Sequence, residues 1–257
     1  MKKILPVIFC FMALLSFAAC SRVEPATGSL SETAQETVSS PSHKTARPLR
    51  DGLSEERITP GFVATLDAAD TYDRIMLTVL PDSTSSEGLF YYFEKIDGVW
   101  VDQLVEVTYI GSEGVGDADF YHEVTPAGIY PFRMLFGIKP DPGCIMPYTQ
   151  LTGSEYWCAG TYFNQFIDER YFDHSACAKE RDEHLAEIDS YQYVAAFDYN
   201  PECIVDEGCA FFLHCYCDHP WTEGCVSIPE EAMRYLMTRI DENTCIIIDT
   251  VDNLTNY

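Results

Sequence analysis

The chain has 257 residues, of which 41 are acidic and 16 basic, and its formal net charge is -25 at neutral pH. Nucleic-acid affinity depends on clustered Lys and Arg side chains that contact phosphates, so this balance argues against a nucleic-acid partner. Such acidity is typical of the solvated surface of a secreted protein, and attraction of an amine-bearing substrate is the alternative. The length is sufficient for one large folded domain or two small ones.

The N-terminus has the pattern of a bacterial export signal. Lys2 and Lys3 precede an apolar run over residues 4–17, which is shorter than the roughly 20 residues of a membrane-spanning helix. Residues 16–20 (SFAAC) resemble the lipobox of bacterial lipoproteins, where cleavage leaves a lipid-modified cysteine. This resemblance implies a signal peptide over 1–19, lipidation of Cys20 and a membrane-anchored, extracytoplasmic protein that faces the cell wall or periplasm. An ordinary signal peptide is the alternative.

The next segment, 20–57, is rich in Ser, Thr, Pro, Glu and Ala, and this composition predicts a flexible linker. A folded domain is expected over 58–257. Alternating and apolar runs predict a mainly β (α+β) domain, with an Asp97–Gly98 hairpin turn between the second and third strands. The expected strands cover 74–80, 89–96, 99–110, 128–135, 191–199, 208–215 and 244–250.

Helical signals are fewer. Residues 175–188 are charged and are expected to form turns or a helix. Pro229 followed by Glu230 and Glu231 is typical of a helix N-terminus, and it predicts a helix over 232–240 with an apolar face.

The chain contains eleven cysteines. Cys10 lies in the signal, Cys20 in the lipobox, and Cys225 in the motif described below. The others are even in number, so outside the cytoplasm they can form disulfides, and free buried thiols are the alternative. They are Cys144, Cys158, Cys177, Cys203, Cys209, Cys215, Cys217 and Cys245.

A histidine and a cysteine eleven residues apart are the strongest chemical signal. His214 ends an apolar strand (FFLH), and Cys225 follows Gly224, which can tighten a turn and expose the next backbone N–H. A thiol beside an imidazole is a typical nucleophile and base pair for acyl transfer. The nearby Cys215, Cys217 and His219 also suggest zinc, but the paired C-x-x-C spacing of zinc sites is absent, and no metal or cofactor is predicted.

At these residues the chain resembles the L,D-transpeptidase catalytic-domain family. That family pairs a strand-end histidine with a later Ser/Thr-x-Gly-Cys-apolar motif, which residues 222–226 (TEGCV) match. Residues 114–116 and 125–130 (TPAGIY) match its glycine stretch and following strand, and the likeness covers roughly 74–250. Glu223 and Ser227 depart from it, because many members have His and Arg at these places and use them toward a substrate carboxylate.

The resemblance implies a fold, a site and a reaction. The fold is an L,D-transpeptidase-like β-sandwich with a few helices and a lid-like insertion. Cys225 is the nucleophile and His214 its base, with a pKa of the thiol lowered by the histidinium and a backbone carbonyl orienting the ring. The N–H groups of Gly224 and Cys225 form the oxyanion hole. Substrate contacts are expected at Thr222, Tyr156, Trp157 and His184, with turn or packing roles as the alternative.

The expected reaction joins peptidoglycan stem peptides. The donor stem is cleaved after its diamino acid, D-Ala is released, and the Cys225 acyl-enzyme passes to an amine of a second stem. Water as acceptor makes the protein a carboxypeptidase or endopeptidase on stem peptides instead. The alternative that is not an enzyme is an inactive wall-binding lipoprotein. The departures at Glu223 and Ser227 leave this alternative open, whereas the intact His214 and Cys225 argue against it.

Overall fold

The computed structural model describes residues 58–176 and 181–257. The predicted signal peptide, the lipidation of Cys20 and the linker lie outside these residues. The described part is mainly β, as predicted, with two short α-helices, α1 (Pro60–Val63) and α2 (Glu230–Met237). Among the described residues, no helix has the length and hydropathy of a membrane span.

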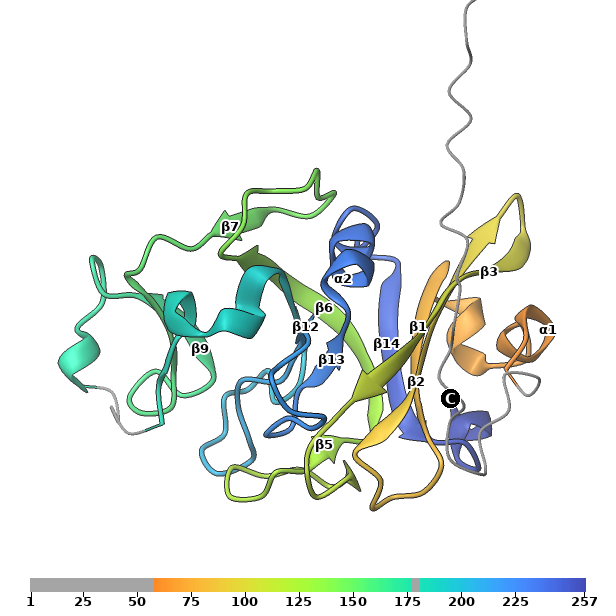
Figure 1. Ribbon diagram of the computed structural model, residues 1–257, viewed down its shortest axis with the longest axis horizontal. Coiled ribbons are helices and arrows are strands. Elements are labelled where there is room, and N and C mark those ends of the chain that lie inside the picture. Colours follow the sequence, from red (N-terminus) through yellow and green to blue (C-terminus); the bar gives the residue numbers. More distant parts are fainter. Residues whose placement is uncertain (1–57, 177–180) are drawn as a thin grey trace, which may run out of the picture. The chain divides into compact units, whose positions relative to one another are not determined.

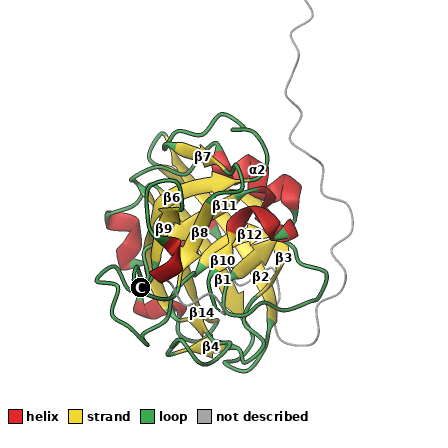
Figure 2. Ribbon diagram, turned by 90° about the vertical axis from the view of Figure 1, so that its left-hand side faces the viewer, coloured by secondary structure: helices red, strands yellow, loops and turns green. Residues whose placement is uncertain are grey.

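Eight strands close into a mixed barrel. The sheet order is β11-β12-β13-β3-β2-β1-β14-β6, and β11 pairs back onto β6, while β7 (Tyr148–Gln150) extends the β6 edge (Figures 1 and 2). The barrel strands are β1 (Arg74–Leu80), β2 (Glu87–Ile96), β3 (Val99–Tyr109), β6 (Gly128–Gly137), β11 (Val194–Phe197), β12 (Phe212–Cys215), β13 (Val226–Ile228) and β14 (Thr244–Thr250).

The closed barrel differs from the expected sandwich. A sandwich leaves sheet edges open, whereas here β11 accepts β12 on one side and β6 on the other, so no edge remains between these strands. The two pairings join segments that are distant in sequence, with Val194 opposite both His214 and Phe136.

Two clusters of the hydrophobic core lie on the two faces of strand β1. Its side chains alternate, and both faces are buried. Met76 and Leu80 pack in a cluster with side chains from strands around the barrel and from α2. Ile75 and Leu77 pack in a second cluster with residues near α1 and the C-terminal turn η5 (Leu254–Asn256). Both clusters hold β1 between β2 and β14.

A second, three-stranded sheet lies between β7 and β11 in the chain, with the order β10-β8-β9. It consists of β8 (Glu155–Cys158), β9 (Gln165–Asp168) and β10 (Glu183–His184). A two-stranded sheet pairs β4 (Val115–Gly116) with β5 (Thr125–Pro126). The remaining elements are short 3-10 turns, namely η1 (Asp67–Asp70), η2 (His174–Ala176), η3 (Leu185–Glu187) and η4 (Asp189–Gln192).

The cysteines divide unequally between bonded and free. Cys158 is disulfide-bonded, whereas the other seven cysteines of the described segments are free thiols. Most of the described cysteines therefore pack in the fold without a covalent partner.

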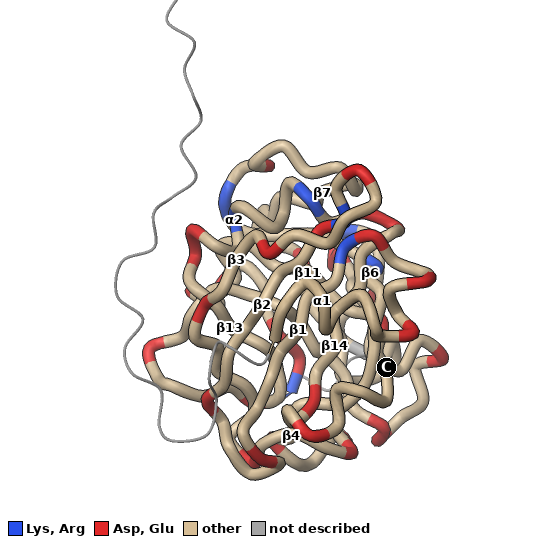
Figure 3. The backbone as a smooth tube through the Cα atoms, turned by 90° about the vertical axis from the view of Figure 1, so that its right-hand side faces the viewer, with Lys and Arg blue, Asp and Glu red and all other residues tan. Residues whose placement is uncertain are grey.

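Acidic residues outnumber basic ones on the side of the molecule that Figure 3 draws.

Candidate active site

Cys225 and His214 are held by two neighbouring strands. The parallel strands β12 and β13 pair Leu213 with Val226 and His214 with Ser227, and Cys225 comes directly before β13. Because alternate residues of a strand share one face, His214 lies on the same side of β12 as Phe212, next to the start of β13. The structure therefore places His214 on β12 and Cys225 directly before the adjacent strand β13, and no hydrogen bond links the two residues within the described segments.

The Cys225 sulfur has defined backbone neighbours. It lies 3.2 Å from the carbonyl oxygen of Ala210, to which the thiol donates, and 3.4 Å from the N–H of Phe212. Ala210 adopts a positive φ of 60°, which is uncommon outside glycine. The N–H of Ala210 in turn donates to the buried side chain of Asn164, which therefore helps to hold the carbonyl against the thiol.

The His214 ring is oriented by a backbone carbonyl, the type of partner that was predicted. Its Nδ1 lies 2.6 Å from the carbonyl oxygen of Cys215. Since a carbonyl only accepts, Nδ1 carries the hydrogen and Nε2 is left as the basic nitrogen. The ring of Tyr191 packs edge-on against the imidazole at 5.3 Å between centroids. The imidazole is thereby fixed on two sides.

Burial keeps both groups uncharged at neutral pH. It raises the pKa of the Cys225 thiol well above its usual value, and the carboxylates of Glu183 and Glu223 raise it further. Burial also lowers the pKa of His214 to about 4, despite the opposing hydrogen bond to Cys215. The prediction of a thiol pKa lowered by a histidinium is therefore wrong, because an apolar environment disfavours both ions. A neutral imidazole can still accept the proton as the thiol attacks.

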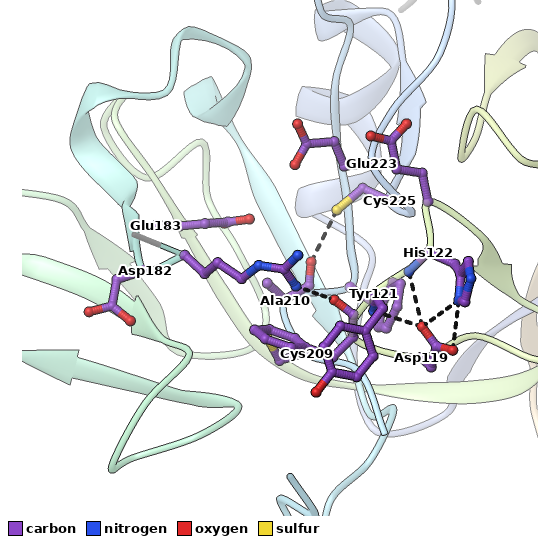
Figure 4. Close-up of a pocket in the computed structure, with 13 residues that line it drawn as sticks. Asp119, Tyr121, His122, Asp182, Glu183, Cys209, Ala210, Glu223 and Cys225 are labelled. Atoms are coloured by element: carbon purple, nitrogen blue, oxygen red, sulfur yellow. Dashed lines mark hydrogen bonds and ion pairs between the residues drawn. The ribbon is translucent and has the colours of Figure 1, made fainter. Parts of the chain in front are cut away.

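A cavity of about 460 Å³ reaches Cys225 (Figure 4). Its walls come from residues 119–123, 181–183 and 209–211, together with Glu223 and Cys225. Five of these side chains are carboxylates, against the single guanidinium of Arg181, which donates to the carbonyl of Phe120. Cys225 is 8% exposed, and it lies at the wall of this acidic cavity.

The turn before Cys225 uses part of the predicted oxyanion hole. The N–H of Gly224 donates to the hydroxyl of Thr222 at 3.2 Å, and that hydroxyl donates to the carbonyl of Cys225 at 2.6 Å. Gly224 is therefore not a free donor, and the N–H of Cys225 is the remaining candidate for the developing oxyanion. The buried Thr222 closes the turn, and it is not part of the cavity wall.

Gly224→Ala is expected to destabilise the fold by about 2–4 kcal/mol. Gly224 has a φ of +130°, and an added Cβ would lie 2.6 Å from the Phe211 ring. Urea unfolding of the variant measures the change. Gly143→Ala is the control, since Gly143 also has a positive φ (+105°) but open space around it, and a loss of about 1–2 kcal/mol is expected there. Equal losses in the two variants would contradict the packing argument.

The other predicted substrate residues lie outside the cavity wall. Trp157 is buried, packs on Phe212 and donates from Nε1 to Asn164 at 3.0 Å. Tyr156 is stacked against the ring of His184 at 4.4 Å, and His184 Nε2 lies 2.8 Å from the Gly153 carbonyl. These contacts join β8 to the barrel strand β12 and to β10.

Sequence reasoning assigned no role in the site to Glu183, Tyr191 or Ala210. Each owes its place to tertiary structure: Glu183 lies on β10 opposite Trp157 of β8, and Tyr191 lies in η4. No group of three or more His, Cys, Asp or Glu side chains suited to a metal ion occurs among the residues the structure describes.

Comparison with known proteins gives distant structural matches. No protein-family model and no curated protein matches the sequence. Among solved structures, the chain is similar to the helical cell shape determining protein Pgp2 from Campylobacter jejuni, with 15% identity and a TM-score of 0.38 over 70% of this chain and 49% of that one. It is also similar to Bd1075 from Bdellovibrio bacteriovorus, with 15% identity and a TM-score of 0.36 over 74% and 55%. The chain thus spans about half the length of these proteins.

Proposed function

We propose that the protein is a cysteine-dependent acyltransferase that acts on peptidoglycan stem peptides, with Cys225 as nucleophile and His214 as base. The observation that carries the proposal is the cavity that reaches the Cys225 thiol, next to the strand that bears His214. The family resemblance of residues 222–226 supplies the substrate class.

The chemistry needs only groups that the chain contains. Nε2 of the neutral His214 takes the thiol proton while the sulfur attacks the carbonyl by which the diamino acid of a stem peptide is linked to D-Ala. The N–H of Cys225 binds the oxyanion, and one such donor is typically worth about 3–4 kcal/mol in the barrier. Release of D-Ala leaves a thioester, and an amine of a second stem completes the cross-link. A lipid on Cys20 would hold the enzyme at the membrane, outside the cytoplasm.

Muropeptide mass spectrometry tests this function. Peptidoglycan fragments with tetrapeptide stems are incubated with protein that lacks the signal sequence. Transpeptidation predicts cross-linked dimers together with free D-Ala. Trimmed monomers without dimers would contradict transpeptidation and support the hydrolytic alternative, in which water is the acceptor. Unchanged fragments would contradict both and favour an inactive wall-binding protein.

A further inference from the structure

Glu183 brings a carboxyl group from the second sheet to the nucleophile. It lies on β10, which pairs with β8, and it lines the same cavity as Cys225. Figure 4 shows its side chain reaching from one wall toward the Cys225 sulfur. Its charge has the largest electrostatic effect of any group on the thiol. The carboxyl group and the sulfur therefore face the same cavity.

Tyr191 holds this carboxyl group in one orientation. The buried Tyr191 hydroxyl donates to Oε2 of Glu183 at 2.6 Å, and the same phenol ring packs against the His214 imidazole. Oε1 accepts no hydrogen bond in the parts of the chain that the structure describes. One oxygen is thus fixed, and the other is available to a group in the cavity.

His214 is poorly placed for the second proton transfer. His214 is 3% exposed and does not line the cavity. The leaving amine of a peptide attacked by Cys225 from this cavity would lie within the cavity. The nitrogen of an amide must gain a proton as it leaves, since an amide anion is too basic to be expelled. Glu183 is on the wall, and burial raises the pKa of its carboxyl group to about 7, with Tyr191 opposing and Glu223 adding to the shift. Near neutral pH it can both donate and accept a proton.

We propose that Glu183 is a catalytic residue that protonates the leaving amine and then deprotonates the incoming one; this rests on the proposed function. In the first half, the Cys225 proton goes to His214, the sulfur–carbon bond forms, and the carbon–nitrogen bond breaks as the nitrogen takes the proton of Glu183. In the second half, the acceptor amine attacks the thioester and gives a proton to the Glu183 carboxylate. The sulfur–carbon bond then breaks, and the thiolate recovers its proton from the His214 imidazolium.

The test is the dependence of Glu183→Gln on the leaving group. Two donors share one acyl part, a peptide that ends in the diamino acid: one carries D-Ala in amide linkage, the other a p-nitrophenyl ester, whose leaving group needs no proton. Acylation of the variant, followed by intact-protein mass spectrometry, is expected to fall at least about 100-fold with the amide and to stay within about 3-fold with the ester. Glu242→Gln makes the same chemical change at an exposed site and should alter neither rate.

A second variant, Tyr191→Phe, also tests the role of Glu183. Tyr191→Phe retains the ring beside His214 but removes the bond to Glu183, so it should slow the amide about 10-fold and spare the ester. Equal losses with both donors in Glu183→Gln and Tyr191→Phe would show a structural role and overturn the proposal, as would unchanged amide acylation. A wild-type protein that even the ester does not acylate would instead refute the proposed function itself.

Discussion

Cys225→Ala is expected to lower stem-peptide turnover by at least about 10⁴-fold, because no other group can form the acyl-enzyme. The rate of D-Ala release from a tetrapeptide stem measures this loss. The fold should survive, because alanine is also small and only the contacts of the sulfur with Ala210 and Phe212 are lost. Thermal unfolding checks that point.

Cys144→Ala is the matched control for this prediction. Cys144 is a free, partly buried thiol that does not line the cavity, so its loss should leave turnover unchanged. Turnover that persists in Cys225→Ala and disappears in Cys144→Ala would show that Cys225 is not the nucleophile.

His214→Gln is expected to slow acylation by the p-nitrophenyl ester about 10² to 10⁴-fold at pH 7. The pKa of His214 is about 4, so in the wild-type protein the imidazole is neutral and able to accept a proton at every pH well above that value. Acylation should therefore fall as the pH drops through about 4. An acid limb near 6.5, the pKa of an exposed histidine, would contradict the buried site.

The lowered pKa of His214 also makes the stability of the fold depend on pH. A histidine whose pKa is lowered in the folded state takes up its proton more readily in the unfolded chain. As the pH falls from about 6.5 to about 4, the unfolded state binds the extra proton and the free energy of unfolding decreases. His214→Gln lacks this group, so its stability should depend less on pH over that window, and urea unfolding at pH 4.5 and pH 7 measures the difference.

The regular elements could be predicted because their signals are local. The strand over 74–80 has the predicted bounds, and the strands over 99–110 and 244–250 agree with β3 and β14 to within one residue. The helix that starts near Pro229 begins two residues earlier and ends three residues earlier than predicted. Each of these segments has either buried residues on both faces or a clear start signal.

The closure of the barrel and the wall of the cavity could not be predicted in this way. β11 and β6 pair across about sixty residues of chain, and nothing in either segment specifies the partner. Glu183 is placed by its pairing with Trp157, and the thiol pKa depends on how many groups surround the sulfur after folding. The identity of Cys225 and His214 is visible in the sequence, whereas their charge state is a property of the packed structure.

The central claim is that the Cys225 thiol is a nucleophile open to a peptide carbonyl through the acidic cavity. Incubation with the p-nitrophenyl ester of the diamino acid peptide, followed by intact mass measurement and peptide mapping, tests it most directly. We expect one acyl group per chain, located on Cys225 and absent from Cys225→Ala. An unmodified Cys225, or an acyl group that maps to another of the free thiols, would contradict the account.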